Sequence, residues 1–379
     1  MSDNQLGIKK LGFGYMRLPI KNGRFDSETV NAMVDRFLEL GYSYFDTAFI
    51  YEGSEDALRE SLVERHPRES FSITTKLATF AISDPSKQRE QLEVSLKRLG
   101  TDYIDYYFIH GLGGESIKLA DKLDSWGYLR SMKELGLTRH IGFSFHGTPA
   151  ELDDILTKHP EMELVQLQIN YLDWENPEVR SRELYEVARK HNKQISVMEP
   201  TKGGLLAGQD STAGDILKAF NPNVSVASWA FRFIWSLEGV MVALSGMENL
   251  EQINDNANTF DNFTPLTPEE RAKLEEVAER IRSTPRIPCT SCRYCTTHCP
   301  QKIQIPIYIG IYNNMLVFRD TNSTGYSYSQ NSFPGASTPA DCIKCRACEE
   351  HCPQHIEISD IMEKFTSKLE EVRARFRAA

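Results

Sequence analysis

Eight cysteines, all at or after Cys289, are the feature that most restricts how this chain of 379 residues can fold. They form two copies of one spacing, Cys-x2-Cys-x2-Cys-x3-Cys-Pro, over residues 289–300 and 342–353. A disulfide scaffold would distribute its crosslinks through a small secreted domain, but the first 288 residues contain no cysteine. Structural zinc is the other alternative, although zinc sites usually combine two separated cysteine pairs. The spacing therefore favours two iron–sulfur clusters.

The cysteine region resembles ferredoxin-type modules with two [4Fe-4S] clusters, in which three close thiolates hold one cluster and the fourth reaches the other. This resemblance implies two crossed ligand sets. They are Cys289, Cys292, Cys295 and Cys352 for the first cluster, and Cys342, Cys345, Cys348 and Cys299 for the second. We expect residues 288–379 to form this smaller α+β ferredoxin-like domain.

Residues 1–264 alternate between short apolar runs and amphipathic stretches, which is the pattern of repeated βα units. Strands are predicted at 11–17, 43–47, 70–76, 104–110, 140–145, 164–170, 194–199 and 239–245. Helices are predicted near 27–40, 54–65, 86–99, 119–135, 149–158, 178–191, 224–236 and 249–257. Eight such units predict a closed (β/α)8 TIM barrel. An open doubly wound sheet is the alternative, but its glycine-rich turn is incomplete at Gly12-Phe13-Gly14. A helical linker, 265–287, would join the two domains.

Charge and hydropathy exclude several kinds of partner. The formal net charge of -10 argues against nucleic acid or an anionic membrane surface. No run approaches the roughly 20 apolar residues of a membrane span, and the N-terminal residues lack the apolar centre of a signal peptide. We therefore expect a cytoplasmic protein that binds neither nucleic acid nor membranes.

Polar residues at the predicted strand ends indicate a catalytic site, because TIM barrels carry their active sites at the carboxyl ends of the strands. Asp46, Lys76 and His110 end the second, third and fourth predicted strands, and Tyr51 follows Asp46 by five residues. A lysine ammonium near Tyr51 is expected to lower the pKa of the phenol, and Asp46 would keep Lys76 charged. Neutral His110 would orient a carbonyl oxygen toward Tyr51. This set suits proton transfer to an oxygen while a hydride reaches its carbon.

At these residues the chain resembles the aldo-keto reductase superfamily, over residues 5 to 260. The motifs are LGFGYMRLP, GYSYFDTAFIYEGSEDALRESL, TTKL, DYYFIHG and HIGFSFH. The resemblance implies that Tyr51 is the general acid and that Asp46, Lys76 and His110 support it. It also implies an extended nicotinamide dinucleotide across the barrel mouth. The residues implied to contact it are Ser144 and Gln168 at the carboxamide, and Ser245, Gly246, Met247, Asn249, Gln252 and Asn256 along the adenosine. Lys202 is a further candidate, for the pyrophosphate, and a solvated loop lysine is the equal alternative at that position.

The chain departs from the family pattern at several of these cofactor positions. Phe145 follows Ser144 where the family usually has asparagine. Gly246, Met247 and Gln252 stand where lysine, serine and arginine often hold the 2′-phosphate. Without these charged contacts to the 2′-phosphate, the preference for NADPH is less secure than is usual in the family, and NADH is a second candidate.

The predicted function is an oxidoreductase that reduces a small-molecule carbonyl, or oxidises an alcohol, with NADP or NAD. The clusters would transfer electrons, to a redox partner protein for example, sense redox state or stabilise the fold. One alternative is a barrel converted into a flavin-linked or ferredoxin-linked electron-transfer module, since hydride moves two electrons and a cubane moves one. A bound flavin is therefore not excluded. Another alternative is a non-enzymatic subunit that senses nucleotides. Aromatic and basic residues near the strand ends are candidates for lining the substrate pocket: Tyr15, Arg17, Phe49, Trp126 and Trp174.

Overall fold

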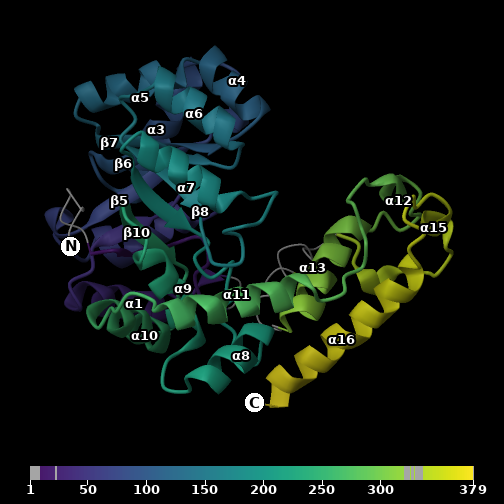
Figure 1. Cartoon of the computed structure of the whole chain (residues 1–379). Coiled ribbons are helices and arrows are strands. Elements are labelled where there is room, and N and C mark those ends of the chain that lie inside the picture. The colour runs from purple at the N-terminus through teal and green to yellow at the C-terminus, as the bar shows by residue number, and fades with distance from the viewer. Residues whose placement is uncertain (1–8, 22–23, 320–324, 326–327, 329–335, 379) are drawn as a thin grey trace. The chain divides into compact units, whose positions relative to one another are not determined.

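The computed structural model describes residues 9–21, 24–319, 325, 328 and 336–378. These residues group into two compact units (Figure 1). The larger unit contains the residues up to Gly203 together with Ala227–Glu275. The smaller unit contains Gly204–Val226 and the residues from Glu276 onward. This grouping differs from the expected domain limits at Gly204–Val226, which lies within the barrel sequence and packs with the cysteine region.

Eight parallel strands of the larger unit close into a barrel, which confirms the predicted fold. Each strand pairs with its neighbours in chain order, and β1 closes the ring against β10. All eight predicted strands are present. Their bounds are β1 (Leu11–Gly14), β4 (Tyr44–Asp46), β5 (Ser72–Leu77), β6 (Ile104–Leu112), β7 (Thr138–Phe145), β8 (Leu164–Gln168), β9 (Gln194–Met198) and β10 (Val240–Ser245).

Side chains fill the inside of the barrel. Tyr44 of β4 is fully buried there, and its hydroxyl accepts a hydrogen bond from Thr74 Oγ1 at 2.6 Å. Gly12 of β1 makes room for this ring, because a Cβ atom at residue 12 would lie within 3.0 Å of the side chains of Val242, Leu244 and Tyr44. The barrel is therefore a packed core whose open end, and not its centre, is available for chemistry.

Helices follow most of the barrel strands, as the sequence predicts. Their bounds are α1 (Ser27–Glu39), α2 (Ser54–Leu58) with a π-helical turn (Arg59–Val63), α3 (Ser86–Leu99), α4 (Glu115–Lys122), α5 (Ser125–Glu134), α6 (Pro149–Lys158), α7 (Ser181–Lys190), α9 (Val226–Trp235) and α10 (Leu250–Asp261). Short 3-10 turns lie at Arg68–Ser70 and Thr79–Ala81. Helix α11 (Pro268–Arg282) follows the barrel and is divided between the two units.

Three local features differ from the sequence-based expectation. The predicted helix 119–135 is two helices, because Asp124 adopts a left-handed backbone (φ 49°) and its carboxylate caps the start of α5. A small antiparallel pair, β2 (Ile20–Lys21) and β3 (Arg24–Phe25), precedes α1. Helix α8 (Thr212–Phe220), in the loop after β9, was also not predicted.

The smaller unit is built from helices and cysteine loops. Besides α8 and part of α11, its elements are α12 (Tyr294–Thr297), α13 (Ile305–Phe318), a 3-10 turn (Pro339–Asp341), α15 (Ala347–Glu350) and α16 (Ile358–Ala378). The described part of this unit contains no strand, so only the helices of the expected α+β module are seen there. Helix α8 joins it through Thr212 Oγ1, which donates to the carbonyl of Val317 at 3.0 Å, and through an ion pair between Asp215 and Arg319.

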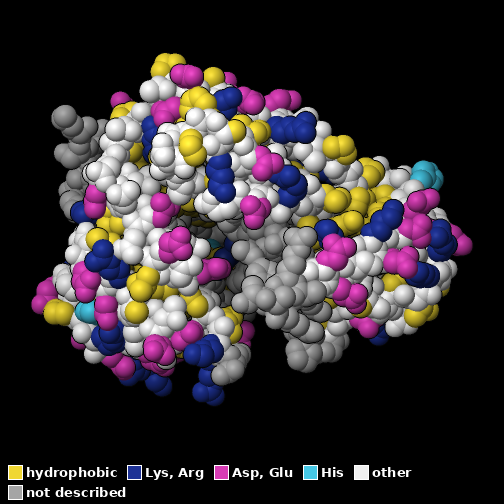
Figure 2. Space-filling model, turned by 90° about the horizontal axis from the view of Figure 1, so that it is seen from below, with side chains coloured by type: hydrophobic (Ala, Val, Ile, Leu, Met, Phe, Trp, Pro, Cys, Tyr) yellow, Lys and Arg dark blue, Asp and Glu magenta, His cyan; other side chains and the backbone are white. Residues whose placement is uncertain are grey.

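One face of the molecule shows how charged side chains are distributed over the described residues. Lys and Arg side chains alternate with Asp and Glu on the face drawn in Figure 2. Within the described ranges, no helix is both long and apolar enough to cross a membrane.

Candidate active site and cluster sites

Three of the four predicted catalytic residues lie on adjacent strands, toward their carboxyl ends. Asp46 is the last residue of β4, Lys76 lies in β5 and His110 lies in β6. Parallel pairing puts Asp46 beside Thr74 and Lys76 beside Phe108. The three side chains therefore converge on one sector of the barrel mouth, and Tyr51 reaches the same sector from the loop after β4.

Lys76 is the buried centre of this sector, with 1% of its surface exposed. Its Nζ donates to Asp46 Oδ1 at 2.7 Å and to the Thr47 carbonyl at 2.7 Å. The second carboxylate oxygen of Asp46 accepts from Gln166 Nε2 at 3.1 Å. Both carboxylate oxygens of Asp46 are thus hydrogen-bonded, one to Lys76 and one to Gln166. The Asp46 carboxylate in turn balances the positive charge of the buried Lys76 ammonium.

Tyr51 lies against both Lys76 and His110. Lys76 Nζ lies 5.2 Å from the centroid of the Tyr51 ring. The Tyr51 and His110 rings meet edge to face, with centroids 5.7 Å apart and an interplanar angle of 83°. The structure therefore brings together all four residues that the sequence singled out.

The electrostatics of the sector differ from expectation at Tyr51. Burial raises the pKa of the phenol above its usual value, and the opposing effect of Lys76 is smaller. The expected lowering of the Tyr51 pKa is therefore wrong for the protein without bound ligand. The pKa of Lys76 is raised despite its burial, because Asp46 stabilises the ammonium.

His110 is neutral in this environment. Burial, with smaller contributions from Lys76 and His146, lowers its pKa to about 3. Its Nδ1 atom is buried and has no hydrogen-bond partner among the described residues. His146, at the end of β7, was not among the predicted residues, and burial lowers its pKa also. Two imidazoles with lowered pKa values, those of His110 and His146, thus interact with each other in this part of the barrel, and His110 contacts the Tyr51 ring.

The two residues predicted to contact the carboxamide both offer a free polar group. Ser144 Oγ accepts from the backbone N–H of Gly111 at 2.8 Å, and its own hydrogen has no acceptor among the described residues. Gln168 Nε2 donates to Asp173 Oδ2 at 2.9 Å, and within the same ranges its oxygen is unpaired. One donor and one acceptor are the complement of an amide group.

Lys202 is held by an ion pair, so it is not the solvated loop lysine that its position also allowed. Its Nζ donates to both carboxylate oxygens of Asp173, each at 2.8 Å. Asp173 is fully buried and also accepts from Asn170 Nδ2 at 2.8 Å. The sequence reasoning missed Asp173, although the Asn-Tyr-Leu-Asp turn directly after β8 was a usable signal.

The six residues predicted along the adenosine lie where β10 meets α10, and they divide into exposed and buried positions. Asn249 caps α10 by accepting from Gln252 N at 2.9 Å. Ser245 and Asn256 are buried and bonded to each other at 3.1 Å. Met247 is 1% exposed, so its side chain belongs to the core and only its backbone remains for a ligand. Gly246 and Gln252 are exposed, so they are more accessible to an adenosine than Ser245, Met247 or Asn256.

Two of the candidate pocket-lining residues, Tyr15 and Trp126, pack against other side chains of the barrel unit. Tyr15 is buried, and its hydroxyl is hydrogen-bonded to Ser61 at 2.9 Å. Trp126 of α5 stacks on His159 with ring centroids 4.3 Å apart, and its indole N–H donates to Asp121. Both aromatic side chains are explained by packing between helices and strands.

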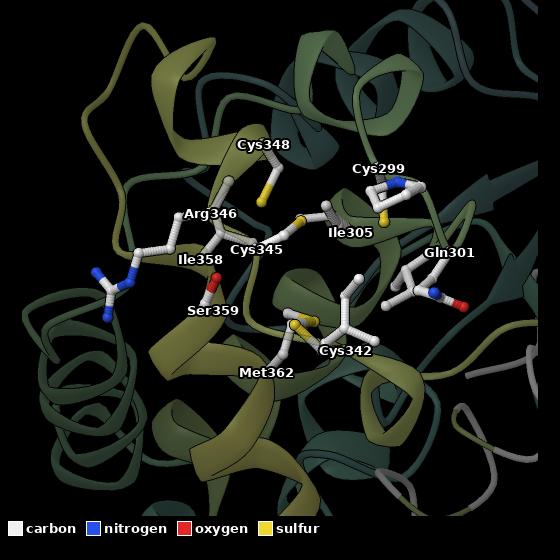
Figure 3. Close-up of a pocket in the computed structure, with 13 residues that line it drawn as sticks. Cys299, Gln301, Ile305, Cys342, Cys345, Arg346, Cys348, Ile358, Ser359 and Met362 are labelled. Carbon is white, nitrogen blue, oxygen red and sulfur yellow. The ribbon is translucent and has the colours of Figure 1, made fainter.

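The eight cysteines are free thiols arranged around two cavities of the smaller unit. One cavity is lined by Cys289, Cys292, Cys295 and Cys352. The other is lined by Cys299, Cys342, Cys345 and Cys348. In Figure 3 the sulfur atoms of the second set surround one common space. The structure thus groups the thiols in the two crossed sets that the spacing predicts; the ligand assignment itself stays a prediction.

The residues around each cavity fit an iron–sulfur cubane better than a single zinc ion. Zinc needs four sulfurs at about 2.3 Å from one point. Among the described residues, no three His, Cys, Asp or Glu side chains converge closely enough to hold one ion. The cavity walls between the thiols are apolar, with Ile305, Ile358 and Met362 at one and Ile309 and Ile356 at the other. Burial raises the pKa of the Cys295 and Cys348 thiols, the latter to about 12.

The sequence profile of the Aldo/keto reductase family matches residues 10–279 of this chain. The chain belongs to the aldo/keto reductase family. The profile of the 4Fe-4S dicluster domain matches residues 288–357, so this reductase carries an iron–sulfur dicluster domain after its barrel.

Known reductases resemble the barrel part of this family member. An aldo-keto reductase of Mycolicibacterium vanbaalenii is 33% identical over 286 residues, which are 75% of this chain and 92% of that protein. A 9,11-endoperoxide prostaglandin H2 reductase of Trypanosoma cruzi is 30% identical and covers 74% and 91% of the two chains. The solved holo form of an aldo-keto reductase from Bacillus halodurans superposes with a TM-score of 0.57 at 25% identity, covering 71% of this chain and 91% of that one.

Proposed function

We propose that this aldo/keto reductase reduces a small-molecule carbonyl, or oxidises the corresponding alcohol, with a nicotinamide dinucleotide bound at the barrel mouth. The observation that carries the proposal is the sector formed by Asp46, Tyr51, Lys76 and His110. A buried ammonium beside a phenol, with a neutral imidazole on the other side, is suited to delivering a proton to an oxygen and stabilising the phenolate left behind.

Each side chain has a distinct part in this proposal. The Tyr51 hydroxyl donates its proton to the carbonyl oxygen. Lys76 stabilises the resulting phenolate, and Asp46 keeps Lys76 charged through the 2.7 Å bond. His110 hydrogen-bonds the substrate oxygen and holds it near Tyr51. In the oxidation direction the Tyr51 phenolate accepts the proton of the alcohol.

The mouth residues fit a nicotinamide cofactor. When bound, the reduced ring supplies the hydride that the protein has no group to provide. The Ser144 hydroxyl and the Gln168 oxygen would hold the carboxamide, one as donor and the other as acceptor. Asp173 keeps the Gln168 amide oriented for this contact. A solved reductase from Klebsiella pneumoniae with this fold is a complex with NADPH, which is compatible with the proposal.

Nucleotide binding is the direct test of this function. Titration of the purified protein with NADPH and with NADH, followed by the fluorescence of the reduced ring, is expected to show saturable binding of at least one of them. We expect a weaker preference for NADPH than in reductases whose lysine and arginine bind the 2′-phosphate. The reason is that Gly246, Met247 and Gln252, at the corresponding positions, carry no positive charge. Absence of binding by both nucleotides would contradict the proposal and favour the flavin-linked alternative, whereas saturable binding without carbonyl reduction would favour the sensing alternative.

The smaller unit is proposed to hold two [4Fe-4S] clusters in its thiol-lined cavities. Cys295 and Cys348 are buried in the same apolar core as Tyr308, Ile309 and Phe365. A cluster bound at each cavity would therefore crosslink the segments that form this core and stabilise the fold. This structural role would apply whether or not the clusters also transfer electrons. Arg293 and Arg346 lie in the two cysteine loops, where positive charge offsets that of a cluster.

The pH dependence of reduction follows from the two shifted groups. His110, with a pKa of about 3, stays neutral above pH 5, and Tyr51, with its pKa raised above 10, stays protonated through pH 9. We expect kcat/KM for reduction to show no limb near pH 6.5 that originates from His110. Profiles of the wild type, His110→Gln and His146→Gln check this. A limb near pH 6.5 that disappears only in His110→Gln would contradict the assignment of a neutral imidazole.

A further inference from the structure

The two cysteine loops of the smaller unit adopt the same backbone conformation. Residues with positive φ occur in pairs at a constant separation of 53 residues, the distance from Cys289 to Cys342. The pairs are Ser291 and Lys344 (58° and 55°), Arg293 and Arg346 (67° and 60°), and Lys302 and His355 (56° and 50°). The loops are therefore structural repeats, and a residue of one loop has a defined counterpart in the other.

Two histidines occupy equivalent places in these repeats and meet each other. His298 ends α12 with φ -99° and ψ 0°, and His351 ends α15 with φ -101° and ψ 6°. Their rings stack with centroids 3.5 Å apart and an interplanar angle of 19°. Both side chains are exposed. The stack is therefore a direct side-chain contact between the two repeats.

Each stacked histidine directly precedes the cysteine that crosses to the other cavity. Cys299 follows His298 and lines the cavity of Cys342, Cys345 and Cys348. Cys352 follows His351 and lines the opposite cavity. The backbone position of each crossing thiol is therefore tied, through one peptide bond and one ring contact, to the position of the other.

We propose that the His298–His351 stack couples the assembly of the two clusters, acting as a positioning contact and not as a ligand. The inference rests on the cluster sites of the proposed function. A cluster in the first cavity fixes Cys352 and therefore His351. Through the stack it then fixes His298 and Cys299, which is the fourth thiol of the second cavity. Filling one cavity thus lowers the ordering cost of the other.

The strength of this coupling follows from the contact. Stacked ring pairs contribute about 2- to 12-fold in equilibrium terms, equivalent to roughly 0.5–1.5 kcal/mol at 1.4 kcal/mol per tenfold. The half-loaded state is measured as a ratio, the squared four-iron population over the product of the empty and eight-iron populations. This ratio is inversely proportional to the coupling constant, so loss of the stack is expected to raise it by one such factor, about 2- to 12-fold.

The experiment uses the full-length chain stripped of metal and rebuilt with half of the iron and sulfide that it can bind. Native mass spectrometry then counts chains with no iron, four irons and eight irons. The wild type is expected to give mainly empty and full chains. His298→Ala and His351→Ala are expected to accumulate the half-loaded form. Glu350→Ala, an exposed neighbour of His351, is the matched control and should behave as wild type.

A stack-preserving variant separates positioning from any other role of the histidines. The double variant His298→Phe with His351→Phe retains two flat rings and is expected to restore the wild-type distribution. If it accumulates the half-loaded form as the alanine variants do, or if the alanine variants match the wild type, the coupling proposal is wrong. If an alanine variant takes up no iron, the phenylalanine pair alone decides. A wild type that never reaches about eight irons would instead overturn the proposed cluster sites.

Discussion

Replacing Tyr51 with phenylalanine is expected to lower kcat/KM for carbonyl reduction by about 100- to 10,000-fold. The substitution removes the hydroxyl of the ring that lies against both Lys76 and His110 and leaves that ring in place. The affinity for the nicotinamide cofactor should stay near that of the wild type, because the phenol proton acts on the substrate oxygen. Steady-state kinetics and nucleotide titration of the same preparation measure the two quantities.

Tyr171 provides a matched control for this variant. Its hydroxyl is buried and has no hydrogen-bond partner among the described residues. Tyr171→Phe therefore removes an equivalent oxygen, just after β8, without removing a proton donor from the sector around Lys76. Its kcat/KM should equal that of the wild type. Retained turnover in Tyr51→Phe would refute the assignment of Tyr51 as the acid.

Replacing Cys352 with alanine is expected to remove the cluster held by Cys289, Cys292 and Cys295, and to lower the iron content from about eight to about four per chain. The reason is that Cys352 lines their cavity, although it lies in the second cysteine run. Iron and sulfide analysis after anaerobic reconstitution with excess iron measures the loss. Zinc in place of iron and sulfide in the wild type would overturn the cluster assignment.

Combined variants identify which cluster is lost. Cys352→Ala together with Cys292→Ala removes two ligands of the same predicted cluster, so about four irons should remain. Cys352→Ala together with Cys345→Ala affects both clusters, and nearly all iron should be lost. The opposite pattern would show that each cysteine run holds its own cluster and that no ligand crosses between them.

Much of the barrel could be predicted from the sequence, because its determinants are local. Strands buried on both faces appear as short apolar runs, so all eight strands were found within a few residues of their bounds. The polar residues Asp46, Lys76 and His110 lie at the ends of three successive predicted strands, so they could be identified as catalytic candidates from the sequence. The α8 helix was missed, since its position depends on contacts with Val317 and Arg319 about 100 residues later in the chain.

The candidate site was less predictable where long-range contacts set the energies. The pKa of Tyr51 depends on how completely the surrounding chain excludes water, and this burial outweighs the ammonium beside it. Lys202 was expected to be available to a pyrophosphate, but Asp173 binds it from a different loop. Neither the extent to which a side chain is buried nor the partner of a charged group can be predicted from the neighbouring residues in the sequence.

Spacing and periodicity, which are properties of neighbouring residues, were sufficient to determine the barrel, the family resemblance and the two cysteine runs. Only the folded chain decided that Asp173 binds Lys202, that His298 and His351 stack, and that burial raises the pKa of Tyr51. The physical reason is that a hydrogen bond, a ring contact or a pKa depends on distances in space, which are set jointly by segments far apart in the chain.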